Sequence, residues 1–191
     1  MNNGNNRNNE GRLLPINPLG DHRQLLCYQK AEVIYDLTYS FAHKYISLGD
    51  RTLDQMIQAA RSCKQNIVEG NAAMHTSTEM GIKLLNVAKA SLQELLADYE
   101  DYLRVRNLQQ WDACSKEVEA MQLLGRTHST SSYFLELADT RTDEVFANMI
   151  IVMIHQADAL IYKFIQSRYR YFLQEGGFRE RLARERQKHR R

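Results

Sequence analysis

The chain has 191 residues, 43% of them hydrophobic and 25% charged, which are ordinary values for one globular domain with a buried core. Its net charge of +2 at pH 7 conceals a basic end, because residues 176–191 hold seven basic and two acidic side chains. Three widely separated cysteines exclude a disulfide framework and a cysteine-based zinc site, and they favour a reducing compartment.

Residues 1–20 are rich in asparagine and glycine and contain both prolines of the chain, Pro15 and Pro18. This composition predicts a disordered N-terminal arm. The arm lacks the apolar segment of a signal peptide, and the longest apolar run, 149–154, is too short to cross a bilayer. We therefore expect a cytoplasmic protein with no membrane partner.

After the arm, apolar residues recur three and four positions apart and no proline interrupts them. The pattern predicts four long helices: 21–48, from Asp50 or Thr52 to Met74, 78–106 and 142–175. Asp21 is the expected N-cap of the first helix, and Thr76 or Ser77 that of the third. The short turns at Gly49 and at 75–77 would make the first three helices antiparallel neighbours.

Residues 107–141 are less regular. They contain one short helical pattern, 111–124, and then a threonine- and serine-rich stretch, 127–132. We interpret this region as a long crossover with one short helix. The predicted fold is all-α: an up-down-up-down four-helix bundle over residues 21–175, with a short extra helix in the crossover and a basic C-terminal helical suffix over 176–191.

The second helix carries a stripe of small or short residues beside its apolar face: Ala59, Ser62, Asn66, Gly70 and Ala73. Such a stripe would let a neighbouring helix approach closely. Asn66 and Glu69 lie on or beside this face, where an unpaired polar group is costly. We expect them to reach partners on another helix or another subunit.

Two separated motifs resemble bacterial four-helix-bundle proteins encoded in 23S rRNA intervening sequences. The first is Tyr28-Gln29-Lys30-Ala31. The second lies in the next helix, where Gln58 stands in place of the family's usual arginine and Cys63 in place of isoleucine or valine. The C-terminal region, with 154–157 and 172–181, is similar to the subgroup that has a four-helix-bundle suffix. The matching residues with an expected packing role are Gln29, Gln55, Ala59, Ala60, Ser62, Asn66, Ile67, Glu69 and Gly70.

The resemblance implies a four-helix bundle that assembles as a homo-oligomer, with a ring-like homopentamer as the usual form. The related accessory protein of diversity-generating retroelements binds a reverse transcriptase and nucleic acid through a basic surface. Most members of the family have no established function. Protein partners and RNA or DNA are therefore both open expectations for this chain.

No catalytic, cofactor-binding or metal-binding residue is predicted. A carboxylate-bridged metal centre in a bundle needs Glu-x-x-His, and none of the six histidines has glutamate three residues before it. No nucleophile elbow or phosphate-binding glycine loop is present. Cys63 is interpreted as a buried structural thiol and His155 as a hydrogen-bonded core residue. An enzyme is thus the poorest of three hypotheses, and a bound metal or cofactor would be needed to revive it.

The basic end carries the most suggestive chemistry, because arginines there alternate with aromatic residues over 168–172. Guanidinium groups neutralise phosphates and aromatic faces stack on unpaired bases. One hypothesis is therefore a nucleic-acid-binding module. The alternative is a protein-interaction scaffold, in which the suffix pairs with carboxylates of a neighbouring subunit or of an acidic partner. The candidate nucleic-acid contacts are Arg168, Arg170, Arg179, Arg181, Arg184, Arg186, Lys188, Arg190 and Arg191.

Overall fold

The computed structural model describes residues 20–189, and within this range the chain forms helices and no strand. The all-α prediction is confirmed. The predictions for the N-terminal arm (except Gly20) and for Arg190 and Arg191 lie outside the described residues. The helices are α1 (Leu26–Tyr45), α2 (Arg51–Ala73), α3 (Thr78–Val105), α4 (Lys116–Thr127), α5 (Ser131–Asp139), α6 (Asp143–Glu175) and α7 (Phe178–Lys188), preceded by a 3₁₀ turn, η1 (His22–Gln24).

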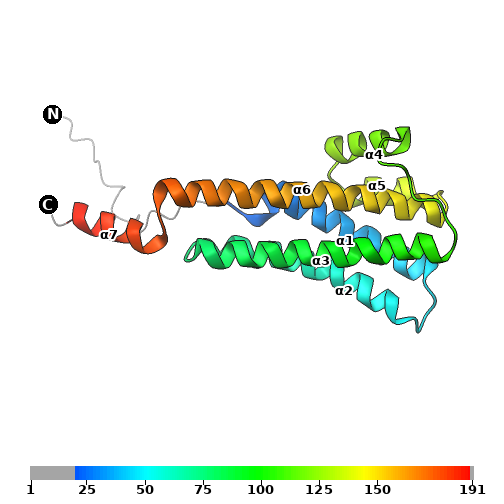
Figure 1. Cartoon of the computed structure of the whole chain (residues 1–191), viewed down its shortest axis with the longest axis horizontal. Coiled ribbons are helices and arrows are strands. Elements are labelled where there is room, and N and C mark those ends of the chain that lie inside the picture. The colour runs from blue at the N-terminus through cyan, green and yellow to red at the C-terminus, as the bar shows by residue number, and fades with distance from the viewer. Residues whose placement is uncertain (1–19, 190–191) are drawn as a thin grey trace, which may run out of the picture.

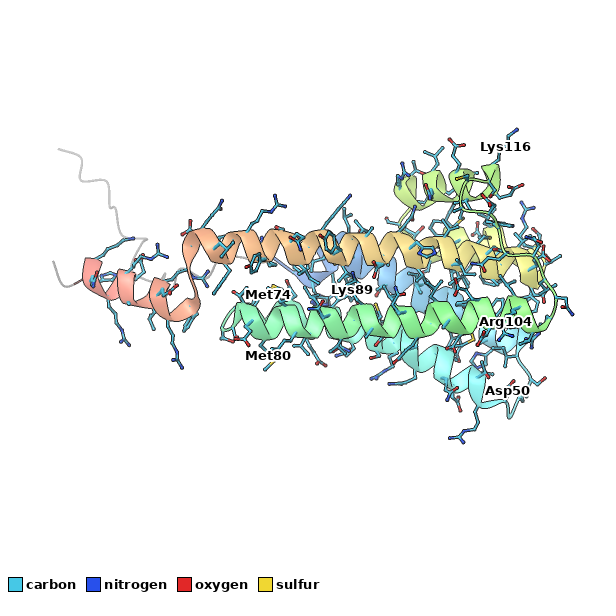
Figure 2. All side chains as sticks on the ribbon, in the orientation of Figure 1. Asp50, Met74, Met80, Lys89, Arg104 and Lys116 are labelled. Atoms are coloured by element: carbon cyan, nitrogen blue, oxygen red, sulfur yellow. The ribbon has the colours of Figure 1, made fainter. Side chains whose placement is uncertain are left out.

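The four long helices pack along one another (Figure 1). Helix α1 contacts α2 and α6, and α3 contacts the same two helices. The short helices are peripheral, with α4 packed on α6 and α5 on α1. An ion pair between Lys89 on α3 and Asp158 on α6, 3.4 Å apart, links two of the long helices. Figure 2 places Met74 and Met80 at one end of the α2–α3 pair, and Asp50 and Arg104 toward the other.

Side-chain caps set the starts of three long helices. Asp50, Ser77 and Thr142 each accept a hydrogen bond from a backbone N–H in the first turn of α2, α3 and α6. The caps at Asp50 and Ser77 agree with the sequence prediction, and Thr142 is where the last long helix was predicted to begin. Helix α6 ends at Gly176, whose φ of 72° lies in the left-handed region that favours glycine.

Three predicted boundaries are wrong. Asp21 caps η1 instead of α1, because its carboxylate accepts from the backbone N–H of Arg23 and the chain turns again at Leu25 before α1 begins. Helix α1 ends at Tyr45, three residues before the predicted end. Trp111 lies in a loop ahead of α4, and the crossover contains a second helix, α5, which was not predicted.

Aromatic side chains fill one part of the core. Phe41 is fully buried, and its ring lies 4.9–5.5 Å from four other aromatic rings, which belong to Tyr45, Tyr99, Tyr102 and Phe146. The buried hydroxyl of Tyr99 donates to Thr38 (3.2 Å), so this polar atom is satisfied inside the core. Helices α1, α3 and α6 therefore meet around a single phenylalanine.

The small-residue stripe of α2 faces α3, as predicted. A Cβ atom at Gly70 would lie 3.1 Å from the carbonyl oxygen of Gly81, and the hydroxyl of Ser91 donates to Ser62 across the same seam (3.0 Å). Within the described residues of one chain, Asn66 does not reach another helix, and the alternative, a partner on another subunit, stays a prediction. The amide of Asn66 donates to the carbonyl and hydroxyl of Ser62, one turn earlier on its own helix.

The remaining motif residues divide between core and surface. Ala59, Ala60 and Ile67 are buried, in agreement with a packing role. Gln55 and Glu69 are exposed, and Gln29 is half-buried with its amide donating to the carbonyl of Arg23. The packing role expected for Gln55 and Glu69 is therefore not seen inside the protein.

Helix α6 is the most apolar of the four long helices. The segment Asp143–Lys188 includes an 18-residue window with a mean hydropathy of 1.5, and 61% of that window is buried inside the protein. By length and composition this helix passes the test for a membrane span, but a core helix passes the same test. Its burial among α1, α3 and α4 accounts for its apolar character.

Candidate functional site

Those basic residues predicted from the sequence that the structure describes lie in the last turns of α6 and in α7. We call residues 164–188, which comprise the end of α6 and all of α7, the C-terminal elbow. Figure 1 shows α6 running past the end of α3, with α7 extending further in the same direction. The turn between the two helices is fixed by the backbone N–H of Gly177, which donates to the carboxylate of Glu180 (2.7 Å).

Two of the predicted contacts are used inside the elbow. The guanidinium groups of Arg168 and Arg181 lie 5.5 and 5.6 Å from the ring centroid of Tyr171. Both side chains are half-buried, and burial lowers the pKa of Arg168. These arginines hold α7 against the end of α6 through cation–π contacts and offer less of their charge to a ligand than an exposed arginine would.

Arg184 also has a structural role, because its guanidinium donates to the backbone carbonyl of Glu175 in the last turn of α6. This carbonyl has no partner within its own helix, and a cation at a helix C-terminus is favourable. Lys188 pairs with Glu185 at 2.7 Å, although both are exposed enough for solvent to weaken the attraction.

The other cations of the elbow are exposed. Arg170 donates to the carbonyl of Gln166 at 3.4 Å, a long and weak bond. Arg179 and Arg186 make no ion pair with any carboxylate in residues 20–189. Because they are seven positions apart, they lie on the same face of α7, about 10 Å from each other along the helix. The elbow thus presents two neighbouring cations to solvent.

Large apolar side chains are exposed beside these cations. Tyr169 is 49% exposed, Phe172 38% and Leu173 64%. Two aromatic rings and one aliphatic side chain are therefore exposed on the last two turns of α6, the helix that also carries Arg168 and Arg170. This combination is the one expected of a surface that meets either unpaired bases or an apolar protein partner.

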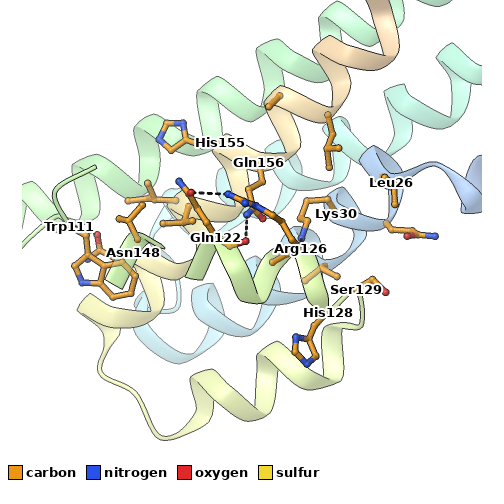
Figure 3. Close-up of a pocket in the computed structure, with 18 of the residues that line it drawn as sticks. Leu26, Lys30, Trp111, Gln122, Arg126, His128, Ser129, Asn148, His155 and Gln156 are labelled. Atoms are coloured by element: carbon orange, nitrogen blue, oxygen red, sulfur yellow. Dashed lines mark hydrogen bonds between the residues drawn. The ribbon is translucent and has the colours of Figure 1, made fainter. Parts of the chain in front are cut away.

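A second candidate site, which sequence reasoning missed, is a pocket of about 900 Å³ between α1, α4 and α6. Figure 3 shows Lys30 of α1 and Gln156 of α6 pointing toward α4. The amide of Gln156 donates to the carbonyl of Gln122 (2.8 Å), and the ammonium of Lys30 donates to the carbonyl of Gly125. These two bonds tie α4 to the rest of the protein and close one side of the pocket.

Lys30 is unusual because only 7% of it is exposed. Burial lowers the pKa of its ammonium group. The carbonyl of Gly125 is one of the last four of α4 and has no partner within that helix, so a cation is favoured there. This lysine forms part of a motif used for the family resemblance, but nothing in the sequence pattern marks it as buried next to a cavity.

The rim of the pocket is held by Asn148, whose side chain is buried. It accepts from the backbone N–H of Trp111 and donates to the carbonyl of Gln109, both at 2.8 Å. Trp111 therefore lines the pocket from the loop before α4. His155 also lines it and is exposed, so its predicted place in the core is wrong. The half-buried residue at this point is its neighbour Gln156.

The cysteines behave as the sequence indicated. Cys27 and Cys63 are buried, and burial raises the pKa of both thiols, that of Cys27 to about 11. Neither thiol is poised to react as a thiolate near neutral pH. In the part of the chain that the structure describes, no group of three or more histidine, cysteine, aspartate or glutamate side chains is placed to hold a metal ion.

No protein-family description, curated protein or solved structure matches this chain. Its function must therefore be argued from its own residues.

Proposed function

We propose that this protein is a non-catalytic, oligomeric helical module that binds nucleic acid through the exposed cations of the C-terminal elbow. The observation that carries the proposal is the pair Arg179 and Arg186, which share one exposed face of α7 and make no ion pair within residues 20–189. Arg170 and Lys188 flank this pair, and Arg190 and Arg191 follow in sequence.

The physical basis is charge neutralisation at the phosphate backbone, which is independent of sequence and weakens as salt is added. Exposed Tyr169 and Phe172 lie on the same elbow and supply ring faces for unpaired bases. This pairing of cations with aromatic rings favours single-stranded RNA or DNA over duplex DNA, whose bases are already stacked. Arg168, Arg181 and Arg184 position α7 and are secondary contacts in this proposal.

The proposal includes the finer description of the fold: α1, α2, α3 and α6 as an up-down-up-down four-helix bundle with α7 as its suffix. Its support is that each of these four helices packs against two of the others and that short turns join the first three. It also includes a relationship to the 23S rRNA intervening-sequence proteins, assembly as a homo-oligomer of pentameric type and a cytoplasmic location. The exposed motif residues Gln55 and Glu69 are then free to contact a neighbouring subunit.

Fluorescence anisotropy with a labelled single-stranded RNA and a labelled duplex DNA tests the nucleic-acid proposal. The variant is Arg179→Gln with Arg186→Gln in the full chain. The matched control is Arg51→Gln with Arg61→Gln, which removes two exposed arginines from α2 instead. We expect the elbow variant to bind RNA about tenfold more weakly and the control to bind like wild type. Equal loss in both variants, or no binding by wild type at low salt, would refute the proposal.

A second candidate function is a protein-interaction scaffold, and the exposure of Leu173 favours it, because an aliphatic side chain gains little from nucleic acid. Under this hypothesis Leu173→Ser reduces the assembly size measured by light scattering and leaves RNA binding unchanged. Under the nucleic-acid hypothesis the assembly size does not change. The two functions are thus separated by one further variant.

A further inference from the structure

We propose that the pocket between α1, α4 and α6 binds an anionic amphipathic small molecule, a carboxylate on an apolar body, and that Lys30 holds its carboxylate. This site is separate from the C-terminal elbow and does not depend on the function proposed above. Three observations carry it: the lining holds basic but no acidic residues, two N–H groups of the Lys30 ammonium have no described partner, and the amide oxygen of Gln156 has none either.

The charged residues that line the pocket are all basic. Lys30, Arg126 and Lys163 contribute to the wall, and His128 and His155 add two imidazoles. Among the described lining residues there is no aspartate or glutamate. A concave surface of one charge sign concentrates ligands of the opposite sign.

The remainder of the wall is largely apolar. Its larger side chains come from all three helices and from the loop before α4, and include Leu26, Val33, Trp111, Val118, Ile151 and Leu160. The volume, about 900 Å³, lies within the range of small-molecule sites. Size and lining therefore fit a molecule with an apolar body and an anionic end.

Lys30 supplies the strongest argument. Its ammonium has three N–H groups, and among the described residues it donates to one partner, the carbonyl of Gly125 on α4. The ring of Phe134, 5.8 Å away, gives a weak cation–π contact. No carboxylate in residues 20–189 forms an ion pair with Lys30. Capping α4 explains one N–H group; a bound carboxylate would satisfy the others and compensate the buried charge.

The amide oxygen of Gln156 is the second unmatched polar atom. It is buried and has no donor among the described residues, whereas the NH₂ group of the same side chain donates to the carbonyl of Gln122. It lies against Gly125, whose carbonyl is the acceptor for Lys30. A ligand with a hydroxyl close to its carboxylate would therefore satisfy Lys30 and Gln156 together. We therefore expect a hydroxy acid to bind more tightly than the simple carboxylic acid of the same length.

Isothermal titration calorimetry of the full chain with decanoate and 3-hydroxydecanoate, below their micelle concentrations, tests the proposal. We expect both to bind, 3-hydroxydecanoate more tightly, and the uncharged decanamide at least tenfold more weakly than decanoate. Trp111 is the only tryptophan in the chain and lines the pocket, so its emission must change on binding. Failure of decanoate to bind, or binding that leaves the Trp111 emission unchanged, would overturn the proposal.

The variant Lys30→Met tests the role assigned to the ammonium. Methionine has a similar length and no charge, and we expect decanoate affinity to fall about tenfold or more. The matched control is Lys64→Met, which removes a half-buried lysine whose ammonium lies 4.3 Å from the ring centroid of Tyr35, outside the pocket lining. Equal decanoate affinity in wild type and in folded Lys30→Met would refute the role of Lys30. If Lys30→Met does not fold, the comparison of decanoate with decanamide on wild type decides whether the charge is recognised.

Discussion

Replacing Gly81 with alanine tests the close approach of α2 and α3. A Cβ atom at this position would lie 2.8 Å from the backbone carbonyl oxygen of Gly70 and would overlap the side chain of Met74. Methionine can adjust, since its side chain is flexible, but the carbonyl moves only if α2 moves. The substitution must therefore push α2 and α3 apart, and these two helices have the most extensive contact of any helix pair in the described residues.

The expected cost follows from two opposing effects. Overpacking a tight interface costs about 1–3 kcal/mol. Alanine offsets part of this cost, because it is favoured over glycine inside a helix by up to about 1 kcal/mol. We expect a net loss of about 1–2 kcal/mol in the free energy of unfolding, which lowers the Tm of a protein of this size by about 2–8 °C.

Urea denaturation followed by circular dichroism measures the loss. The control is Gly125→Ala on α4, where the three atoms nearest to the added Cβ all belong to the end of the Gln156 side chain. We expect the control to lose clearly less stability than Gly81→Ala. If Gly81→Ala is as stable as wild type or more stable, the close contact between α2 and α3 does not exist as described.

Four further changes have defined outcomes. Phe41→Ala empties the centre of the aromatic cluster and should lower the free energy of unfolding by about 3–5 kcal/mol in urea titrations. Tyr171→Ala removes the ring between two guanidinium groups and should speed amide hydrogen exchange in α7 about tenfold, with no change in α3. Asn148→Ala frees the loop before α4 and should shift the emission of Trp111 to longer wavelength; an unchanged spectrum would contradict this. In the folded protein, burial holds the pKa of Lys30 below its ordinary value of 10.5. Between these two pKa values the unfolded chain binds more protons than the folded chain does, so stability increases with pH there. Urea titrations should therefore show wild type gaining stability relative to Lys30→Met as pH rises toward 10.5.

The long helices were predictable because their signals are local. Asp50, Ser77 and Thr142 cap the helices that follow them, and Gly176 ends α6 with a positive φ. Each of these signals lies within a few residues of the boundary that it sets. The close seam between α2 and α3 was also predictable, since a stripe of small residues is visible in the sequence itself.

Helix α5 was missed for a physical reason. It has nine residues, its first position follows Thr130, and Thr130 makes no side-chain capping bond. Its stability comes from tertiary packing, because Phe134 and Ala138 are buried against α1. The threonine- and serine-rich segment 127–132 at the start of this helix has the local composition of a loop.

The candidate sites differ in how far sequence could reveal them. The residues of the C-terminal elbow are contiguous, so its positive charge was evident from the sequence. Which arginines are structural, such as Arg181, and which are exposed, such as Arg179, depends on the position of Tyr171 in the fold. The pocket could not be predicted in this way. Lys30 and Gly125 are 95 positions apart, and they meet only because the packing of α4 on α6 brings Gly125 next to α1.

The salt dependence of RNA binding tests the central claim most directly. For single-stranded nucleic acid, the plot of log Kobs against log salt concentration has a slope of about −0.7 for each phosphate that the protein neutralises. The elbow account predicts that Arg179→Gln with Arg186→Gln makes this slope shallower by about 1.4, while Arg51→Gln with Arg61→Gln leaves it unchanged. Identical slopes for the wild-type chain and the elbow variant would contradict the account.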